Sequence, residues 1–104
     1  KQGAVLKQFD GNYQCLQEMQ NGGSDAVAID KAVALYYVSK GGMNNLKVVG
    51  EPKKLAGSAM AIDKGHDDEL KAINQALAEL KADGTYTKLY QKWFGVDPTA
   101  EELQ

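Results

Sequence analysis

The sequence of 104 residues has little cysteine, little proline and no excess of either charge. Its single cysteine, Cys15, cannot form an internal disulfide and has no neighbours at the spacing of a zinc or iron–sulfur site. No apolar run approaches the roughly 20 residues that a membrane-spanning helix requires. The 12 basic and 14 acidic residues are interspersed and leave a net charge of −2. These features exclude a disulfide scaffold, a cysteine-based metal site and a membrane span, and they argue against nucleic acid as a partner.

What is present is the composition of an ordinary globular protein, with 43% hydrophobic and 25% charged residues. The length allows one small domain and is too short for two domains that each have an independent core. The first residues lack the basic segment, apolar core and cleavage site of a secretory signal. Any export signal is therefore expected to lie outside this sequence or to be absent.

Strand-like and helix-like patterns alternate along the chain. Short apolar segments predict strands over residues 4–9, 25–29, 46–49 and 58–62. Apolar residues at spacings of three and four predict helices over residues 13–20, 31–39, 67–83 and 85–94. This alternation predicts an α/β fold in which parallel strands are joined by right-handed crossovers.

Two segments outside these elements have their own predicted roles. Residues 50–57 contain Pro52 between flanking glycines, which is typical of a connector. Residues 96–104 are acidic and contain Pro98, which predicts a loosely attached tail or a short terminal helix.

Most residues that could carry chemistry have a simpler structural interpretation. His66 lies in a polar turn, where a solvated side chain is far commoner than a base or a ligand. Cys15 has no histidine nearby in the sequence and is expected to be a small, partly buried side chain. The pair Asp67 and Asp68 opens a helix, where acids cap and complement the helix dipole. We expect no catalytic residue, no metal site and no cofactor.

Asp30 stands apart because it follows a predicted strand and directly precedes a helix. The carboxyl ends of strands in open α/β sheets are where ligand crevices lie, and a carboxylate there can bind an ammonium group. The alternative is a helix N-cap, in which the carboxylate accepts hydrogen bonds from the first helical amides. The residues alone leave the two roles equally open.

Three longer segments resemble a known family: GGSDAVAIDKAVALYYVSKGG, LKVVGEP and AMAIDKGHDDELKAINQALAELKADGTYTKLYQKWFG. From Phe9 to Gly95 they are similar to the second half of polar amino-acid-binding proteins of ABC importers, which have the type II periplasmic-binding-protein fold. The closing DGTYTKLYQKWFG is the most specific part. The resemblance implies a two-lobed α/β protein with residues 1–47 in the second lobe, 48–57 as an inter-lobe crossover and 58–104 in the first lobe.

The resemblance also implies a function. Such proteins bind an amino acid in the periplasm, or outside the cell on a lipid anchor, and deliver it to a membrane permease without catalysis. The aspartate equivalent to Asp30 takes the α-ammonium group of the ligand. A dehydratase on the same fold, like cyclohexadienyl dehydratase, and the ligand-sensing domain of a receptor are the alternatives.

The sequence departs from the family pattern in ways that indicate a truncated binding protein. The family's carboxylate-binding arginine and its glycine-and-threonine turn are both missing. Gly23, Lys31 and Ala56 replace a basic, a small and an aromatic residue that are common at these positions. Weak ligand binding is expected as a result. Exposed strand edges, or exchange of an element across residues 50–57, predict a possible homodimer.

Overall fold

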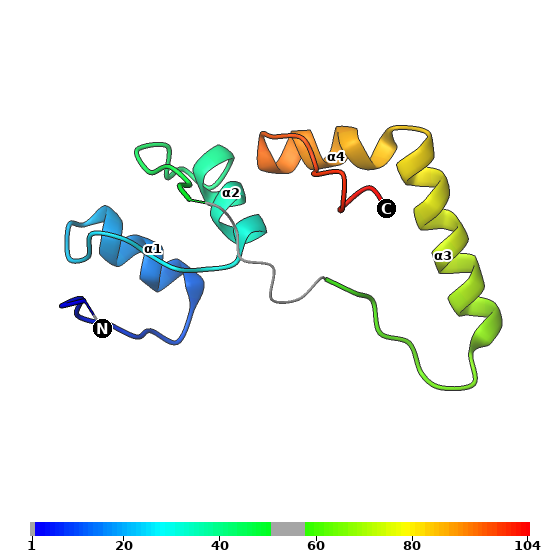
Figure 1. The fold of residues 1–104 in the computed structure, drawn as a ribbon, viewed down its shortest axis with the longest axis horizontal. Helices are drawn as coiled ribbons and strands as arrows, with labels where there is room; N and C mark the ends of the chain where they lie inside the picture. The colour runs from blue at the N-terminus through cyan, green and yellow to red at the C-terminus, as the bar shows by residue number, and fades with distance from the viewer. Residues whose placement is uncertain (1, 51–57) are drawn as a thin grey trace. The chain divides into compact units, whose positions relative to one another are not determined.

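The computed structural model describes residues 2–50 and 58–104 (Figure 1). Within these ranges the regular secondary structure is helical. The four helices are α1 (Asn12–Gln20), α2 (Lys31–Ser39), α3 (Asp67–Ala82) and α4 (Thr85–Phe94). The chain divides into two compact units, Lys1–Val49 and Gly50–Gln104. None of the helices in the described ranges is both long and apolar enough to cross a membrane.

The predicted α/β fold is wrong for this structure, because the described residues contain no strand. Residues 4–9, 25–29, 46–49 and 58–62 have no regular secondary structure. A strand exists only when its backbone bonds to a neighbouring strand, and no backbone hydrogen bond joins any two of these segments. The apolar pattern indicated which segments suit a sheet but did not supply the partner strands. A dimer through strand edges therefore has no basis in the described residues.

The helices lie where the periodicity placed them, because each has a clear start or stop in the sequence. The sharpest stop is Gly95, which ends α4 in the left-handed region at φ 72°. Three acids lie in the first turn of α3 and Lys81 in its last turn, so both ends complement the helix dipole. The predicted side-chain cap of α3 is absent, since His66 occupies the N-cap position and its side chain makes no cap bond.

The first unit contains α1, α2 and the segments around them. Its core is small and includes Leu16 of α1, 3% exposed, and Met43 after α2, 2% exposed. The rings of Tyr13 and Tyr37 join the two helices, with centroids 5.7 Å apart. Lys7 ties the segment before α1 to the turn after it, because its Nζ donates to Glu18 Oε1 at 2.8 Å and to the Gly23 carbonyl at 2.6 Å.

The second unit contains α3, α4 and the C-terminal tail, which runs back along α4 (Figure 1). The tail is attached and forms a turn over residues 100–103, so neither the predicted loose segment nor the predicted short terminal helix is present. Glu102 accepts hydrogen bonds from the Tyr90 hydroxyl at 3.0 Å and from the Thr99 amide at 2.6 Å. Pro98 is buried, and Lys81 donates to the Gln104 carbonyl at 2.8 Å. These contacts join the tail to both helices of the unit.

The corner between α3 and α4 is built by Asp83, Gly84 and Thr85. Gly84 takes φ 84°, which glycine adopts without steric cost. Thr85 is the first helical residue of α4, and Asp83 Oδ1 accepts its amide at 2.8 Å. The pKa of the Asp83 carboxyl lies below its ordinary value of 3.8 because the Thr85 hydroxyl, the Thr85 amide and Lys88 favour the ionised form.

Because the pKa of Asp83 is lowered, the stability of the α3–α4 corner should depend on pH in the acid range. A depressed folded pKa adds stability above the unfolded pKa, and this stability is lost as the pH falls through the folded value. We expect the helical circular dichroism of the protein to fall on acidification below about pH 4, and Asp83→Asn to reduce that fall. The exposed Asp63→Asn serves as the matched control and should titrate like the wild type. The same fall of circular dichroism on acidification in Asp83→Asn and in the wild type would contradict this account of the corner.

Candidate ligand site at the N-terminus of α2

Asp30 is the N-cap of α2. Its Oδ1 accepts hydrogen bonds from the amides of Ala32, at 2.9 Å, and Val33, at 3.4 Å. Its own carbonyl accepts the Ala34 amide at 3.0 Å and so starts the helical bonding pattern. The structure therefore shows the N-cap role, which the sequence left as the alternative to ligand binding.

The same geometry leaves one carboxylate oxygen available. Both cap bonds go to Oδ1, and Oδ2 receives no hydrogen bond from the described residues. The side chain is exposed to solvent and is not turned into a core. An ionised carboxylate has about four lone-pair positions, so Oδ2 can accept an N–H group while Oδ1 keeps the cap. Capping and ligand contact are compatible roles.

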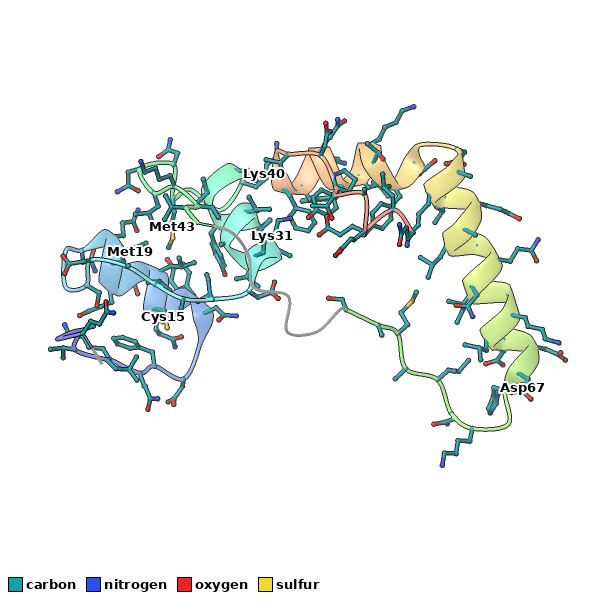
Figure 2. The ribbon with its side chains drawn as sticks, viewed as in Figure 1. Cys15, Met19, Lys31, Lys40, Met43 and Asp67 are labelled. Carbon is teal, nitrogen blue, oxygen red and sulfur yellow. The ribbon has the colours of Figure 1, made fainter. Side chains whose placement is uncertain are left out.

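Helix α2 holds this carboxylate on a defined surface. Lys31 and Lys40 mark its two ends (Figure 2). Its sequence, KAVALYYVS, is apolar around most of its circumference, and most of its residues are half-buried. The Tyr13–Tyr37 ring pair fixes α2 against α1. The position of Asp30 is thus set by the packing of the first unit.

The other candidate residues have ordinary surroundings. His66 is half-exposed and lies 3.4 Å from Glu69 Oε1, one helical turn away. Cys15 is half-buried on α1 and makes no disulfide. Asp67 and Asp68 are exposed in the first turn of α3. Among the described residues, no group of three or more histidines, cysteines and acids is arranged to hold a metal ion.

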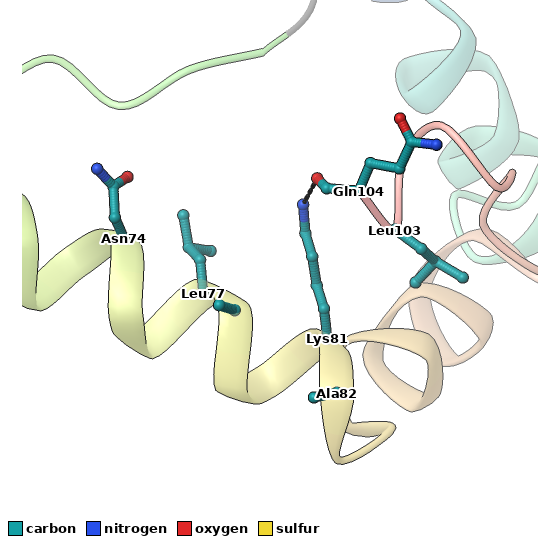
Figure 3. Close-up of a pocket in the computed structure, with 7 residues that line it drawn as sticks. Asn74, Leu77, Lys81, Ala82, Leu103 and Gln104 are labelled. Atoms are coloured by element: carbon teal, nitrogen blue, oxygen red, sulfur yellow. Dashed lines mark hydrogen bonds between the residues drawn. The ribbon is translucent and has the colours of Figure 1, made fainter.

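A hollow of about 410 Å³ lies in the second unit, between α3 and the tail (Figure 3). Its wall combines apolar and polar side chains: Asn74, Leu77, Ala78, Lys81, Ala82, Leu103 and Gln104. The Lys81 ammonium group crosses it to reach the Gln104 carbonyl, which satisfies the one cation in the wall. The hollow is therefore a gap beside the tail attachment and contains none of the predicted site residues.

Three residues with a positioning role, in two short motifs, were missed in the sequence analysis, although the sequence carries a signal for each motif. Thr99 and Glu102 have the spacing of a capping box, and their reciprocal bonds are present, with the Glu102 amide 3.4 Å from Thr99 Oγ1. Asp83 stands two residues before the amide that it accepts, which is the spacing of an Asx turn.

Comparison with known proteins identifies the class. The model of the bacterial extracellular solute-binding proteins, family 3, matches residues 5–96. The chain belongs to this family, which confirms the predicted relationship and indicates a location outside the cytoplasm. No solved structure gives a significant match.

Particular relatives are binding proteins. The L-cystine-binding protein TcyJ of Escherichia coli is 39% identical over 94% of this chain and 36% of its own length. The L-cystine-binding protein TcyA of Bacillus subtilis is 35% identical over 91% of this chain and 35% of its own. PatH of Vibrio harveyi, named as an amino-acid ABC transporter-binding protein, is 35% identical over 90% of this chain and 38% of its own.

The chain thus spans about a third of the length of the curated relatives it matches. These relatives are named as binding proteins and not as enzymes, which agrees with the predicted absence of catalysis. The dehydratase-like and sensory alternatives gain no support from these names. Contact of Asp30 with a ligand stays a prediction.

Proposed function

We propose that this chain is part of a binding protein that captures an amino acid outside the cytoplasm and delivers it to the membrane permease of an ABC importer. The observation that carries the proposal is the exposed Asp30 carboxylate, which caps α2 with one oxygen, while the other receives no hydrogen bond from residues 2–50 and 58–104. Membership of the solute-binding family supports transport over catalysis.

The α-ammonium group of the ligand is the part that Asp30 binds. Every amino acid carries this cation, and its hydrogen bond to a carboxylate is charge-assisted, which makes it shorter and stronger than a neutral one. The helix cap orders the carboxylate before the ligand arrives, so little side-chain entropy is lost on binding. A pre-ordered anion is thus matched to the group that all ligands of this class share.

L-cystine is the ligand that the relatives favour. Both cystine-binding relatives align with more than nine-tenths of this chain, at 39% and 35% identity. Cystine presents two α-ammonium groups joined by a long neutral disulfide linker. One of these groups bonds to Asp30 Oδ2 in the proposed complex.

Residues 1–47 and 58–104 belong to different lobes of the binding protein, and residues 48–57 connect them. The division of the chain into two compact units at Val49 and Gly50 supports this organisation. Most of the proposed connector, residues 51–57, lies outside the described residues. The periplasmic or lipid-anchored location, and a homodimer formed by exchange of an element, stay predictions.

A thermal-shift panel tests the function. The twenty common amino acids and L-cystine are added separately to the 104-residue chain and to the longer binding protein that carries it. At a ligand concentration of 100 Kd, specific binding stabilises the folded state by about 2.7 kcal/mol, so a clear rise in Tm is expected for L-cystine with the longer protein. A smaller rise is expected for the 104-residue chain. Absence of any response by the longer protein across the panel would refute the proposal.

A further inference from the structure

The turn that follows α1 contains an asparagine next to a glycine. Asn21 is the exposed C-cap residue of α1, with φ −82° and ψ 0°, and Gly22 follows in the left-handed region at φ 82°. The side-chain amide of Asn21 makes no hydrogen bond within the ranges that the structure describes. A Cβ built on Gly22 would meet no atom within 4 Å apart from its chain neighbours, so the space on that side of the residue is open.

We propose that Asn21 is a site of spontaneous deamidation. The backbone nitrogen of Gly22 attacks Cγ of Asn21, so that an N–Cγ bond forms and the Cγ–Nδ2 bond breaks. Ammonia leaves with the proton of the Gly22 amide, and a five-membered succinimide ring remains. Water then opens the ring at either carbonyl and gives aspartate or isoaspartate. The net reaction consumes one water, releases one ammonia and needs no enzyme.

The neighbouring residue singles out Asn21. Glycine has no Cβ to hinder the approach of its nitrogen to the side chain, and it reaches the required backbone angles at low cost. The other asparagines precede a tyrosine, an asparagine, a leucine and a glutamine. Asn44 is the best internal comparison, because it is also exposed in a loop and differs in the residue that follows.

The folded turn restrains the reaction. The Gly22 amide donates to the Met19 carbonyl at 3.0 Å, and the Gly23 amide donates to the Glu18 carbonyl at 2.9 Å. Lys7 also holds the Gly23 carbonyl from outside the turn. The Gly22 nitrogen becomes a free nucleophile only when these bonds open, so the rate follows the open fraction of the turn. Deamidation of Asn21 is therefore a chemical measure of how often the end of α1 frays.

The product changes the turn in charge and in length. A new carboxylate at residue 21 lies at the C-terminus of α1, where the helix dipole disfavours negative charge. Isoaspartate also adds one methylene group to the backbone, which displaces the amides of Gly22 and Gly23 from their carbonyl partners. The turn is thus expected to loosen once it has reacted.

Peptide mapping by mass spectrometry, after incubation of the 104-residue chain at mildly alkaline pH, tests the proposal. The peptide with Asn21 should gain about 1 Da and yield both aspartate and isoaspartate. This gain should be roughly tenfold faster than that of the peptide with Asn44. Asn21→Gln should abolish it. Equal rates at Asn21 and Asn44 would overturn the proposal.

Lys7→Met tests the restraint, with Lys64→Met in the other unit as the matched control. Loss of one hydrogen-bond donor to the turn should speed deamidation of Asn21 about two- to tenfold in Lys7→Met. The rate in Lys64→Met should equal that of the wild type. If Lys7→Met also reacts at the wild-type rate, the opening of the turn does not control the reaction and that part of the proposal is wrong.

Discussion

Replacing Asp30 by asparagine is expected to raise the Kd for the amino-acid ligand roughly 10- to 100-fold while the free protein stays folded. A hydrogen bond to a charged group contributes about 1.5–3 kcal/mol, and about 1.4 kcal/mol corresponds to a factor of ten in Kd. Asparagine caps a helix about as well as aspartate. The substitution therefore removes the charge that we propose binds the ammonium group and keeps the acceptor that α2 needs.

Titration calorimetry on the longer protein measures the Kd of Asp30→Asn. Two further variants in this experiment separate ligand binding from helix capping. Asp30→Ala should lose the ligand and also about 1 kcal/mol of stability, because the amides of Ala32 and Val33 lose their acceptor. Asp25→Asn removes another exposed carboxylate of the same segment and should leave both the Kd and the Tm unchanged. Wild-type affinity in Asp30→Asn would remove Asp30 from the binding site.

The helices were predictable because their signals are local. α3 has an apolar residue at nearly every third or fourth position, acids in its first turn and Lys81 in its last turn. Asp30 stands directly before α2, at the position where a side-chain oxygen reaches the first free amides. Periodicity and end signals such as these depend only on residues a few positions apart.

The absence of the predicted strands could not be read from the sequence, because a strand depends on a partner strand that local patterns do not contain. In residues 25–29, Val27 and Ile29 are half-buried while Ala26 and Ala28 are exposed, so one face of this segment is still covered. The alternation expected of a strand is thus partly present, and the ladder of hydrogen bonds is absent. Apolar composition indicates that a segment will be partly buried, but it does not indicate which part of the protein will cover it.

The attachment of the tail was missed for a related reason. The acidic composition of residues 96–104 and Pro98 suggested a solvated segment. Glu102 nevertheless accepts a hydrogen bond from the hydroxyl of Tyr90, twelve residues earlier. A single acid that pairs with a phenol across a turn leaves no periodic signal. The candidate site shows the same limit, because the sequence placed Asp30 at a helix end but could not show that one oxygen remains available.

Tyr90→Ala is expected to cause the largest loss of stability in the second unit, roughly 3 kcal/mol or more. Tyr90 is 8% exposed, its ring packs edge-on against Phe94 at 4.7 Å and lies 6.1 Å from Tyr86, and its hydroxyl bonds to Glu102. Truncation removes the ring that joins α4 to the tail and leaves a cavity between them. Thermal unfolding followed by circular dichroism should show a much lower Tm.

Tyr90→Phe divides this loss into its two parts. Phenylalanine keeps the ring contacts and removes the hydroxyl, so we expect a cost of about 1 kcal/mol, together with faster hydrogen exchange at the Thr99 amide. That amide donates to the other oxygen of the same carboxylate, so a freer Glu102 loosens the tail as well. Leu89→Ala, at a half-exposed position on the same helix, is the matched control and should change the stability by no more than about 0.5 kcal/mol. If Tyr90→Ala costs no more than Leu89→Ala, the tail does not pack on α4 in solution, and the hydroxyl bond to Glu102 cannot be what holds it.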